Sequence, residues 1–273
     1  MPASRPWSAR APDPLRSRLV PRARSGARGV RIRSAGEQGL VVELGDEIDP
    51  VVNARVRRLA REVAAQLAGD VLEVVPTYRS LLVIHDPIRV PRARLAARVE
   101  ALAAALPTAA APEPPGRIVR LPACYGGALG PDLDDVARLK GLSPDDVVAL
   151  HAGATYLVYM LGFTPGFPYL GGMPDRIATP RLETPRPRVA TGSIGIGGAQ
   201  TGVYPVESPG GWRIIARTPV RLFDPAAPAP FLLRAGDRLR FVPVAIDAYH
   251  AIAAQVAAGT YVPEVVEGAG ADA

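Results

Sequence analysis

The sequence predicts an α+β protein of two domains, a small N-terminal α+β domain followed by a β-barrel domain. Before residue 107, short β-branched runs alternate with two amphipathic helical patterns, which is typical of one helical layer packed on a sheet. After residue 116, many short strands are separated by glycine and proline turns, a pattern typical of a closed or nearly closed barrel. The 273 residues are enough for two such cores.

The first domain, residues 34–106, begins with the short strand 39–44 (GLVVEL) and a helix at 49–68. In that helix, apolar residues recur at spacings of three and four, and Asp49 and Pro50 stand where an N-cap and a first-turn proline belong. The other expected elements are strands at 71–76 and 80–85 and an alanine-rich helix at 90–106.

A proline-rich linker, 107–116 (PTAAAPEPPG), prevents regular strand pairing and separates this domain from the barrel domain, residues 117–245. Ser143 and Asp146 belong to a capping sequence that opens a short helix. Residues 246–273 should form a terminal helix and a frayed tail. The expected elements are strands at 117–122, 155–161, 192–196, 202–205, 212–218 and 238–243, and helices at 132–141, 147–152 and 247–258.

The positive charge of the chain is concentrated in residues 1–33. This segment holds nine arginines and one acidic residue, Asp13, whereas the other 240 residues carry 23 basic and 25 acidic groups. The globular part is therefore slightly acidic, which argues against nucleic acid or an anionic membrane as a partner. We expect residues 1–33 to be a disordered extension, because they hold few bulky hydrophobic residues.

Two other interpretations of this extension stay open. Its arginine-rich, acid-poor composition resembles an organellar transit peptide, although prolines at 2, 6, 12, 14 and 21 argue against an amphipathic helix. Alternatively, translation of the natural protein starts near Val30. N-terminal mass determination on natively expressed protein tests this idea, because a peptide from upstream of Val30 contradicts it.

Several absences in the sequence limit the chemistry. No run of 18 apolar residues occurs, and a single cysteine, Cys124, excludes an internal disulfide, so we expect a cytoplasmic protein without a membrane span. Lys140 lacks the glycine loop of an ATP-binding P-loop. The histidines have no ligand partners at i+3 or i+4, so no metal site is expected.

The segment 156–212 is the richest in candidate binding residues. It holds seven of the fifteen aromatic residues and eleven of the 27 glycines in 57 positions. Aromatic rings and permissive backbone are common in the walls of ligand pockets. A β-rich core joined by tight turns needs the same residues, so composition alone leaves both interpretations open.

Two residues in and beside this segment are candidates for polar chemistry. His151 ends a short helix, where the helix C-terminus should favour its protonated form, and it is the best candidate for a general acid or base. A lone histidine is more often structural. Ser193, in Thr-Gly-Ser-Ile-Gly, stands among exposed backbone N–H groups that could hold an anion or carbonyl, although a serine in a tight hairpin is the more common case.

Nearby arginines and amide-binding groups add to the candidates. Arg181, Arg186 and Arg188 lie among prolines, so two of their side chains could face one carboxylate, with surface solvation as the alternative. Gln200 and Thr201 offer neutral donors and acceptors suited to an amide.

Several long motifs resemble the family formed by the B subunit of bacterial 5-oxoprolinase, which also includes the sporulation kinase inhibitor KipI and proteins labelled allophanate hydrolase subunit 1. The resemblance extends over residues 32–244 and implies a cyclophilin-like barrel for the second domain. The matching segments are CYGGALGPDLDDVA (124–137), YLVYMLGFTPGFPYLGGMP (156–174), TPRLETPRPRVATGSIGIGGAQTGVYP (179–205) and SPGGWRIIARTPVRLFDP (208–225).

The resemblance implies that this chain acts with two partners of the 5-oxoprolinase complex, a cyclophilin-like C subunit and an A subunit responsible for ATP-dependent activation. Together these proteins open the lactam of 5-oxo-L-proline, or pyroglutamate, to give L-glutamate. ATP can make an unreactive lactam reactive by phosphorylating the amide oxygen before water attacks. Because this chain has no P-loop, we expect the ATP chemistry to lie at least partly elsewhere in the complex.

For such a site we expect the following residues. His151 transfers a proton, Arg188 binds the substrate carboxylate, and Ser193 belongs to the cradle of backbone donors. The remaining assignments are an aromatic wall of Phe163, Phe167 and Tyr169, backbone donors at Gly195, Gly197 and Gly198, and contacts from Gln200 and Tyr204 to the amide or a phosphate.

Two other functions remain open on the sequence. The carboxyltransferase domains of biotin-dependent urea carboxylases share the barrel, but this chain has no Met-Lys-Met biotin attachment site. A KipI-like inhibitor of a histidine kinase would instead use an exposed apolar patch.

Overall fold

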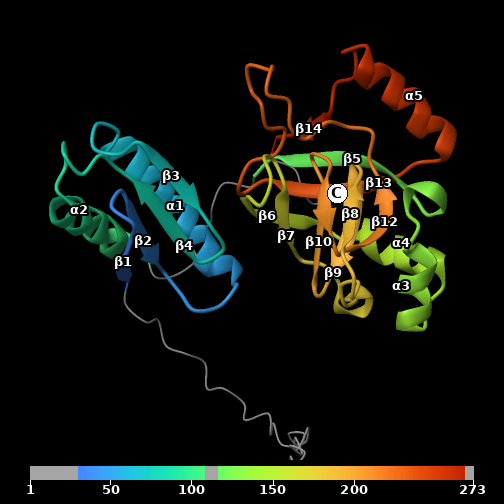
Figure 1. The fold of residues 1–273 in the computed structure, drawn as a ribbon, viewed down its shortest axis with the longest axis horizontal. Helices are drawn as coiled ribbons and strands as arrows, with labels where there is room; N and C mark the ends of the chain where they lie inside the picture. The colour runs from blue at the N-terminus through green and yellow to red at the C-terminus, as the bar shows by residue number, and fades with distance from the viewer. Residues whose placement is uncertain (1–29, 108–115, 268–273) are drawn as a thin grey trace, which may run out of the picture.

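The structure, a computed structural model, describes residues 30–107 and 116–267. These residues form a small α+β domain, blue to dark green in Figure 1, and a barrel domain, light green to red. The expected fold class is therefore confirmed.

The N-terminal domain is a four-stranded antiparallel sheet with two helices, in the strand order β1-β2-β4-β3. Strands and helices share one core, in which Leu59 of α1 and Val99 of α2 are fully buried. Asp49 caps α1 as expected, because its carboxylate accepts the N–H groups of Val51 and Val52. The elements are β1 Arg31–Ala35, β2 Gly39–Glu43, α1 Pro50–Gln66, β3 Glu73–Pro76, β4 Ser80–Ile84 and α2 Arg92–Ala105.

The second domain is a barrel closed by seven strands, in the order β12-β9-β10-β7-β6-β13-β5. β12 then pairs with β5 and completes the circle. Neighbouring strands run antiparallel except β5 and β13, which are parallel. The bounds are β5 Ile118–Tyr125, β6 Tyr156–Leu161, β7 Pro168–Gly171, β9 Ser193–Gly197, β10 Gln200–Val203, β12 Arg213–Arg217 and β13 Arg238–Pro243.

The barrel is flanked by helices and short strands (Figure 1). Ser143 and Asp146 form the expected capping box at the start of α4. α3 ends at Gly141, which adopts a left-handed conformation with φ 64°. These elements are η1 Gly127–Leu129, α3 Leu133–Lys140, α4 Pro144–Gly153, η2 Asp175–Ile177, β8 Arg186–Val189, β11 Ser208–Gly210, α5 Ile246–Ala257 and β14 Glu264–Val266.

Five strands were not expected from the sequence: β1, β7, β8, β11 and β14. Each has three to five residues and is defined by pairing with a neighbour. Residues 31–33 belong to β1 and not to the disordered extension expected over 1–33. Likewise β14 pairs with β5, within the tail expected to fray. Residues 1–29, most of the linker (108–115) and 268–273 lie outside the described residues.

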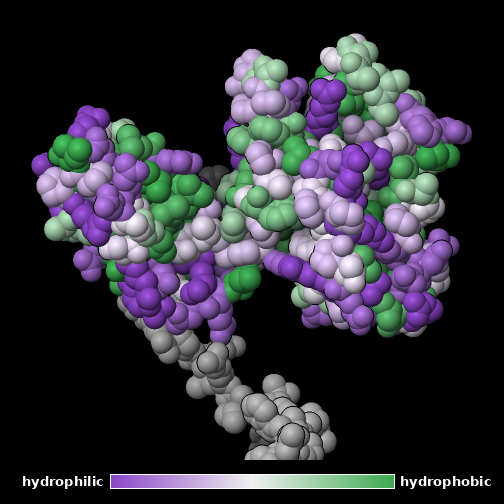
Figure 2. Space-filling view, viewed as in Figure 1, coloured by the Kyte–Doolittle hydropathy of each residue, from purple (hydrophilic) through white to green (hydrophobic). Residues whose placement is uncertain are grey.

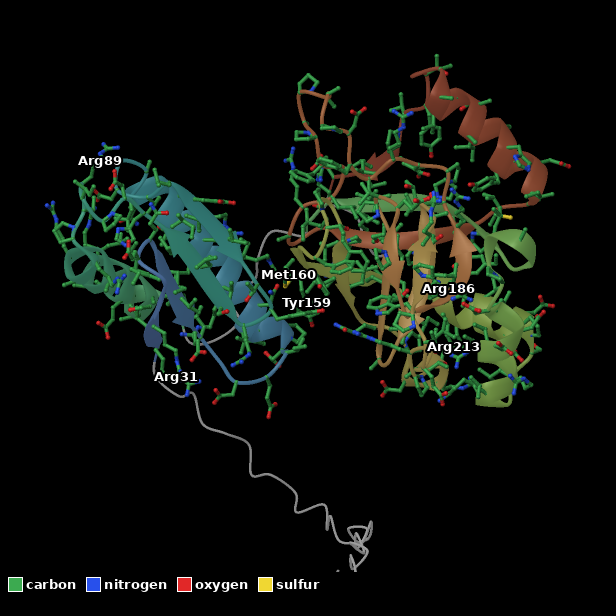
Figure 3. All side chains as sticks on the ribbon, in the orientation of Figure 1. Arg31, Arg89, Tyr159, Met160, Arg186 and Arg213 are labelled. Atoms are coloured by element: carbon green, nitrogen blue, oxygen red, sulfur yellow. The ribbon has the colours of Figure 1, made fainter. Side chains whose placement is uncertain are left out.

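A small group of contacts links the two domains. Asn53 of α1 donates an amide N–H to the carbonyl of Tyr159, at 3.3 Å. The ring of Tyr78 lies against Tyr159 and Tyr169, with centroid distances of 5.4 and 5.5 Å. Gln200 donates to the Tyr78 hydroxyl. Tyr159 accordingly lies on the side of the barrel nearest the N-terminal domain (Figure 3).

A buried carboxylate joins three separate segments of the barrel domain. Asp132 accepts two hydrogen bonds from Arg186 of β8, at 2.7 and 2.9 Å, and a third from the N–H of Ile214 in β12, at 2.6 Å. Its side chain is 6% exposed, so the paired charges are largely shielded from water. Asp132 therefore fixes β8 and β12 relative to the start of α3.

Replacing Asp132 by alanine should lower the free energy of unfolding by about 3 kcal/mol, because Arg186 and the Ile214 N–H lose their partner in a buried position. Urea unfolding followed by circular dichroism measures the change. The matched control is Asp135→Ala in the first turn of α3, since Asp135 forms only a surface pair with Arg138 and the loss of stability should be much smaller. Equal losses in the two variants would contradict this role for Asp132.

Candidate active site

An aromatic groove of about 310 Å³ opens on the surface of the barrel. Its walls come from separate segments: the loop between β6 and β7, the strand β7, the residue after β10, the loop before β8, and the β11–β12 connection. The lining residues are Phe163, Phe167, Tyr169, Arg181, Pro185, Tyr204, Pro209, Gly210, Gly211 and Trp212.

Phe167 is the centre of this groove. Its ring makes edge-to-face contacts with Phe163, Tyr169, Tyr204 and Trp212, with centroid distances of 5.6, 5.3, 5.5 and 5.6 Å. Such T-shaped pairs are favourable beyond the area that they bury. Phe167 is almost fully buried, whereas Phe163 at the rim is 66% exposed. The groove is thus a continuation of the packed core toward the surface.

Several glycines make room for these rings. A Cβ added at Gly197 would lie 2.5 Å from the indole nitrogen of Trp212, and one at Gly210 would lie 2.3 Å from the Tyr204 hydroxyl. At Gly202 it would lie 3.0 Å from the ring of Phe167. The glycine-rich sequence is therefore explained by close approach of aromatic side chains to the strand backbone.

The expected backbone donors Gly195, Gly197 and Gly198 do not line the groove. Gly195 and Gly197 belong to β9, which pairs with strands on both of its sides. The N–H of Gly198 donates to the carbonyl of Thr179, at 2.8 Å. The structure thus contradicts the expectation that these three residues present backbone N–H groups to a ligand, because the barrel uses them.

His151 is fully buried inside the barrel and does not reach the groove. Its Nδ1 lies 2.7 Å from the Tyr125 hydroxyl and its Nε2 lies 2.9 Å from the Thr201 hydroxyl, which in turn lies 3.0 Å from the carbonyl of Gly195. Thr201 gives its one proton to that carbonyl, so Nε2–H must donate to Thr201, and Tyr125 donates to Nδ1. Burial lowers the pKa of His151 to about 3. The expectation that it is protonated is therefore wrong.

Ser193 and Gln200 also lie outside the groove. The carbonyl of Ser193 accepts the N–H of Tyr204, at 2.8 Å, and so fixes the backbone of a groove residue. Gln200 belongs to the domain contact through Tyr78.

The three arginines of the segment 181–188 have different environments. Arg186 is bound to Asp132, and Arg188, which was expected to bind a carboxylate substrate, is bound to Glu207 at 2.8 Å with 76% of its side chain exposed. Arg181 alone among them lines the groove, with its guanidinium carbon 5.8 Å from the centroid of Trp212. Trp212 is a groove residue that the sequence did not single out, whereas Arg181 was one of three candidate arginines and was not the one assigned to the site; both stand in matching motifs.

The rim of the groove contains backbone strain. Phe163 has φ 66°, the one positive value for a residue other than glycine in the described part of the chain. Such a conformation in a bulky residue costs about 1–3 kcal/mol and is common at ligand-binding sites. A tight loop holds it, in which the N–H of Gly162 donates to the carbonyl of Phe167 at 3.1 Å and the N–H of Phe167 donates to the carbonyl of Thr164 at 3.0 Å.

A larger hollow, about 420 Å³, lies between the two domains. Its walls are β3 and the loop 229–235, and Figure 2 shows hydrophobic side chains gathered on the side of the N-terminal domain that faces the barrel. None of the expected site residues lines this hollow. We assign the site to the aromatic groove, because it combines converging rings, a guanidinium and strained backbone.

Two absences within residues 30–107 and 116–267 bear on other classes of site. No group of three or more His, Cys, Asp or Glu side chains is placed to hold a metal ion. No helix in these ranges is long and apolar enough to cross a bilayer.

The barrel and its sequence place the chain among proteins with a carboxyltransferase fold. The model of the family described as "Carboxyltransferase domain, subdomain C and D" matches residues 30–233, and the chain belongs to this family. Urea amidolyase of K. lactis is similar in fold, with a TM-score of 0.73 at 22% identity over 90% of this chain and 17% of that one. At that identity the likeness shows the fold alone.

Other proteins are more similar to this chain in sequence. The protein named as the B subunit of 5-oxoprolinase in Bacillus subtilis strain 168 is 42% identical over 81% of this chain and 95% of its own length. The one in Escherichia coli O157:H7 is 44% identical over 76% of this chain and 93% of its own. The crystal structure of TTHA0988 has a TM-score of 0.67 at 37% identity over 79% of this chain, which spans 40% of that one.

Stability should depend on pH through His151. Its pKa is 6.5 when the chain is unfolded and about 3 when it is folded, so the unfolded state binds the proton first as pH falls. The free energy of unfolding should therefore be fully retained above pH 6.5 and fall toward pH 3, by about 1.4 kcal/mol per unit from this residue.

The measurement is urea unfolding of wild type and His151→Gln at intervals between about pH 7.5 and about pH 5, the range in which the unfolded histidine takes up its proton. His151→Gln should be less stable at neutral pH but show a shallower decline, because glutamine does not titrate. Parallel curves for the two proteins would show that His151 does not stay neutral in the folded state.

Proposed function

We propose that this chain is the B subunit of an ATP-dependent 5-oxoprolinase, which opens the lactam of 5-oxo-L-proline to give L-glutamate in the cytoplasm together with the A and C subunits. The observation that carries this proposal is the 42–44% identity to proteins named as the B subunit of 5-oxoprolinase, over 73–81% of this chain and 93–95% of theirs. The B and C subunits would form a heteromer that completes the site.

The aromatic groove suits a small cyclic amide. A five-membered lactam has two apolar faces and a polar edge, so the rings around Phe167 can cover its faces and exclude water. Tyr204 lies in this wall, and burial raises the pKa of its hydroxyl, which therefore stays protonated. In the proposal, Tyr204 donates a hydrogen bond to the lactam carbonyl oxygen.

The proposal assigns no ATP-binding role to the glycine-rich part of this chain. The glycine-rich sequence around β9 is used for barrel pairing and for clearance of Trp212, and does not form a phosphate-binding loop. ATP supplies activation of the amide oxygen, and the proposal places that chemistry on another protein of the complex. The contribution of this chain is to bind and orient the ring, and His151, Gln200 and Arg188 have no role in that contact.

A KipI-like inhibitor of a histidine kinase is the second candidate. The exposed ring of Phe163 at the rim of an aromatic groove favours it, because such a surface can also dock an apolar face of a protein partner.

The direct test is ATP-dependent release of glutamate from 5-oxoproline by the three co-purified subunits, with this chain omitted as the control. Omission should abolish release. Unchanged release on omission would refute the proposal, and inhibition of a cognate kinase by this chain without any lactam hydrolysis would favour the second candidate.

Within the active complex, Phe163→Ala should lower kcat/KM for 5-oxoproline about tenfold, because an exposed ring that covers part of the ligand is lost without disturbing the core. The matched control is Phe231→Ala. Phe231 is also an exposed ring, 40% accessible, but it lines the hollow between the domains. Equal effects of the two substitutions on kcat/KM would remove the groove as the site.

A further inference from the structure

Arg181 differs from its neighbours in having no carboxylate partner among the residues that the structure describes. Arg186 is neutralised by the buried Asp132, and Arg188 by Glu207. The positive charge of Arg181 is therefore left available at the groove that it lines.

The backbone on both sides of Arg181 is fixed in place. Thr179 exchanges two hydrogen bonds with Gly198, at 3.1 and 2.8 Å, and the N–H of Leu182 donates to the carbonyl of Gly211 at 2.7 Å. The carbonyl of Pro180 accepts from the side chain of Arg213, at 3.0 Å. A backbone held on both sides in this way loses little further conformational entropy when a ligand binds.

The side chain of Arg181 is also oriented by an aromatic ring. Its guanidinium lies 5.8 Å from the centroid of Trp212, within the range of a cation–π interaction. Arg181 and Tyr204 line the same groove. The groove thus has apolar walls with a guanidinium at one side.

We propose that Arg181 recognises the carboxylate of the ligand in the aromatic groove, so that the site selects ring-sized amides that carry a carboxylate beside the ring nitrogen. The identity of that ligand as 5-oxoproline rests on the proposed function. A guanidinium presents parallel N–H donors that match both oxygens of a carboxylate, and it stacks on an indole as an ammonium group cannot. Arg181 fixes the orientation of the ring, and the aromatic walls provide the remaining contact.

The experiment combines protein variants with a ligand that lacks the carboxylate. Wild type, Arg181→Ala, Arg181→Lys and Arg188→Ala are compared with 5-oxoproline and with 2-pyrrolidinone, the same lactam without the acid group. Binding to the full chain is followed by tryptophan fluorescence in a Trp7→Phe background, so that Trp212 gives the signal. KM and kcat are measured in the complete complex of all three proteins.

Arg181→Ala should raise Kd and KM for 5-oxoproline at least about tenfold, the loss of a charge-assisted contact, and leave kcat at saturation nearly unchanged. Its affinity for 2-pyrrolidinone should stay within about twofold of wild type, because that ligand has no carboxylate to lose. Arg181→Lys should be intermediate, and Arg188→Ala should behave as wild type. Thermal unfolding checks that each variant is folded.

Equal weakening of both ligands by Arg181→Ala, or unchanged KM for 5-oxoproline, would overturn the inference. Its failure is distinguishable from failure of the proposed function. A complete wild-type complex that releases no glutamate refutes the function, whereas an active complex that tolerates Arg181→Ala refutes only the role of Arg181. If the isolated wild-type chain gives no fluorescence change with 5-oxoproline, the effect of Arg181→Ala on KM in the active complex tests the inference.

Discussion

Closure of the barrel by β12, which pairs with β9 on one side and β5 on the other, is the constraint on which the rest of the site depends. The register sets Ile214 opposite Gly195 and so places Trp212, just before β12, across the glycines of β9. The indole of Trp212 approaches the backbone of β9 most closely at Gly197, and only glycine leaves room for it there. The groove is therefore a consequence of how the barrel closes.

The same rings stabilise the barrel and form the groove. Phe167 is buried among four aromatic neighbours, and Phe163 extends that cluster to the surface in a strained backbone conformation. One set of residues in segment 156–212 thus forms both a packed core and the wall of a groove. A folded core that continues to the surface gives rigid walls, and rigid walls reduce the entropy lost on binding.

The polar side chains of the barrel domain are of two kinds: some bond to other residues of the domain, and others line the groove. His151 is neutral and engaged with Tyr125 and Thr201, so its burial serves internal hydrogen bonding. Arg186 closes an ion pair with the buried Asp132, whereas Arg181 lies against the ring of Trp212 and has no carboxylate partner among the described residues. Residues that look equivalent in the sequence are separated by the partners that folding brings to each.

The sequence by itself determined the elements whose signals are local. The cap at Asp49, the capping box at Ser143, the apolar strands and the two-domain division with a barrel follow from patterns within a few residues. Only the tertiary structure decided the short strands such as β8 and β14, the burial of His151 and which of the three arginines lines the groove. These depend on partners far along the chain, as Asp132 lies 54 residues from Arg186, and only folding brings such partners together.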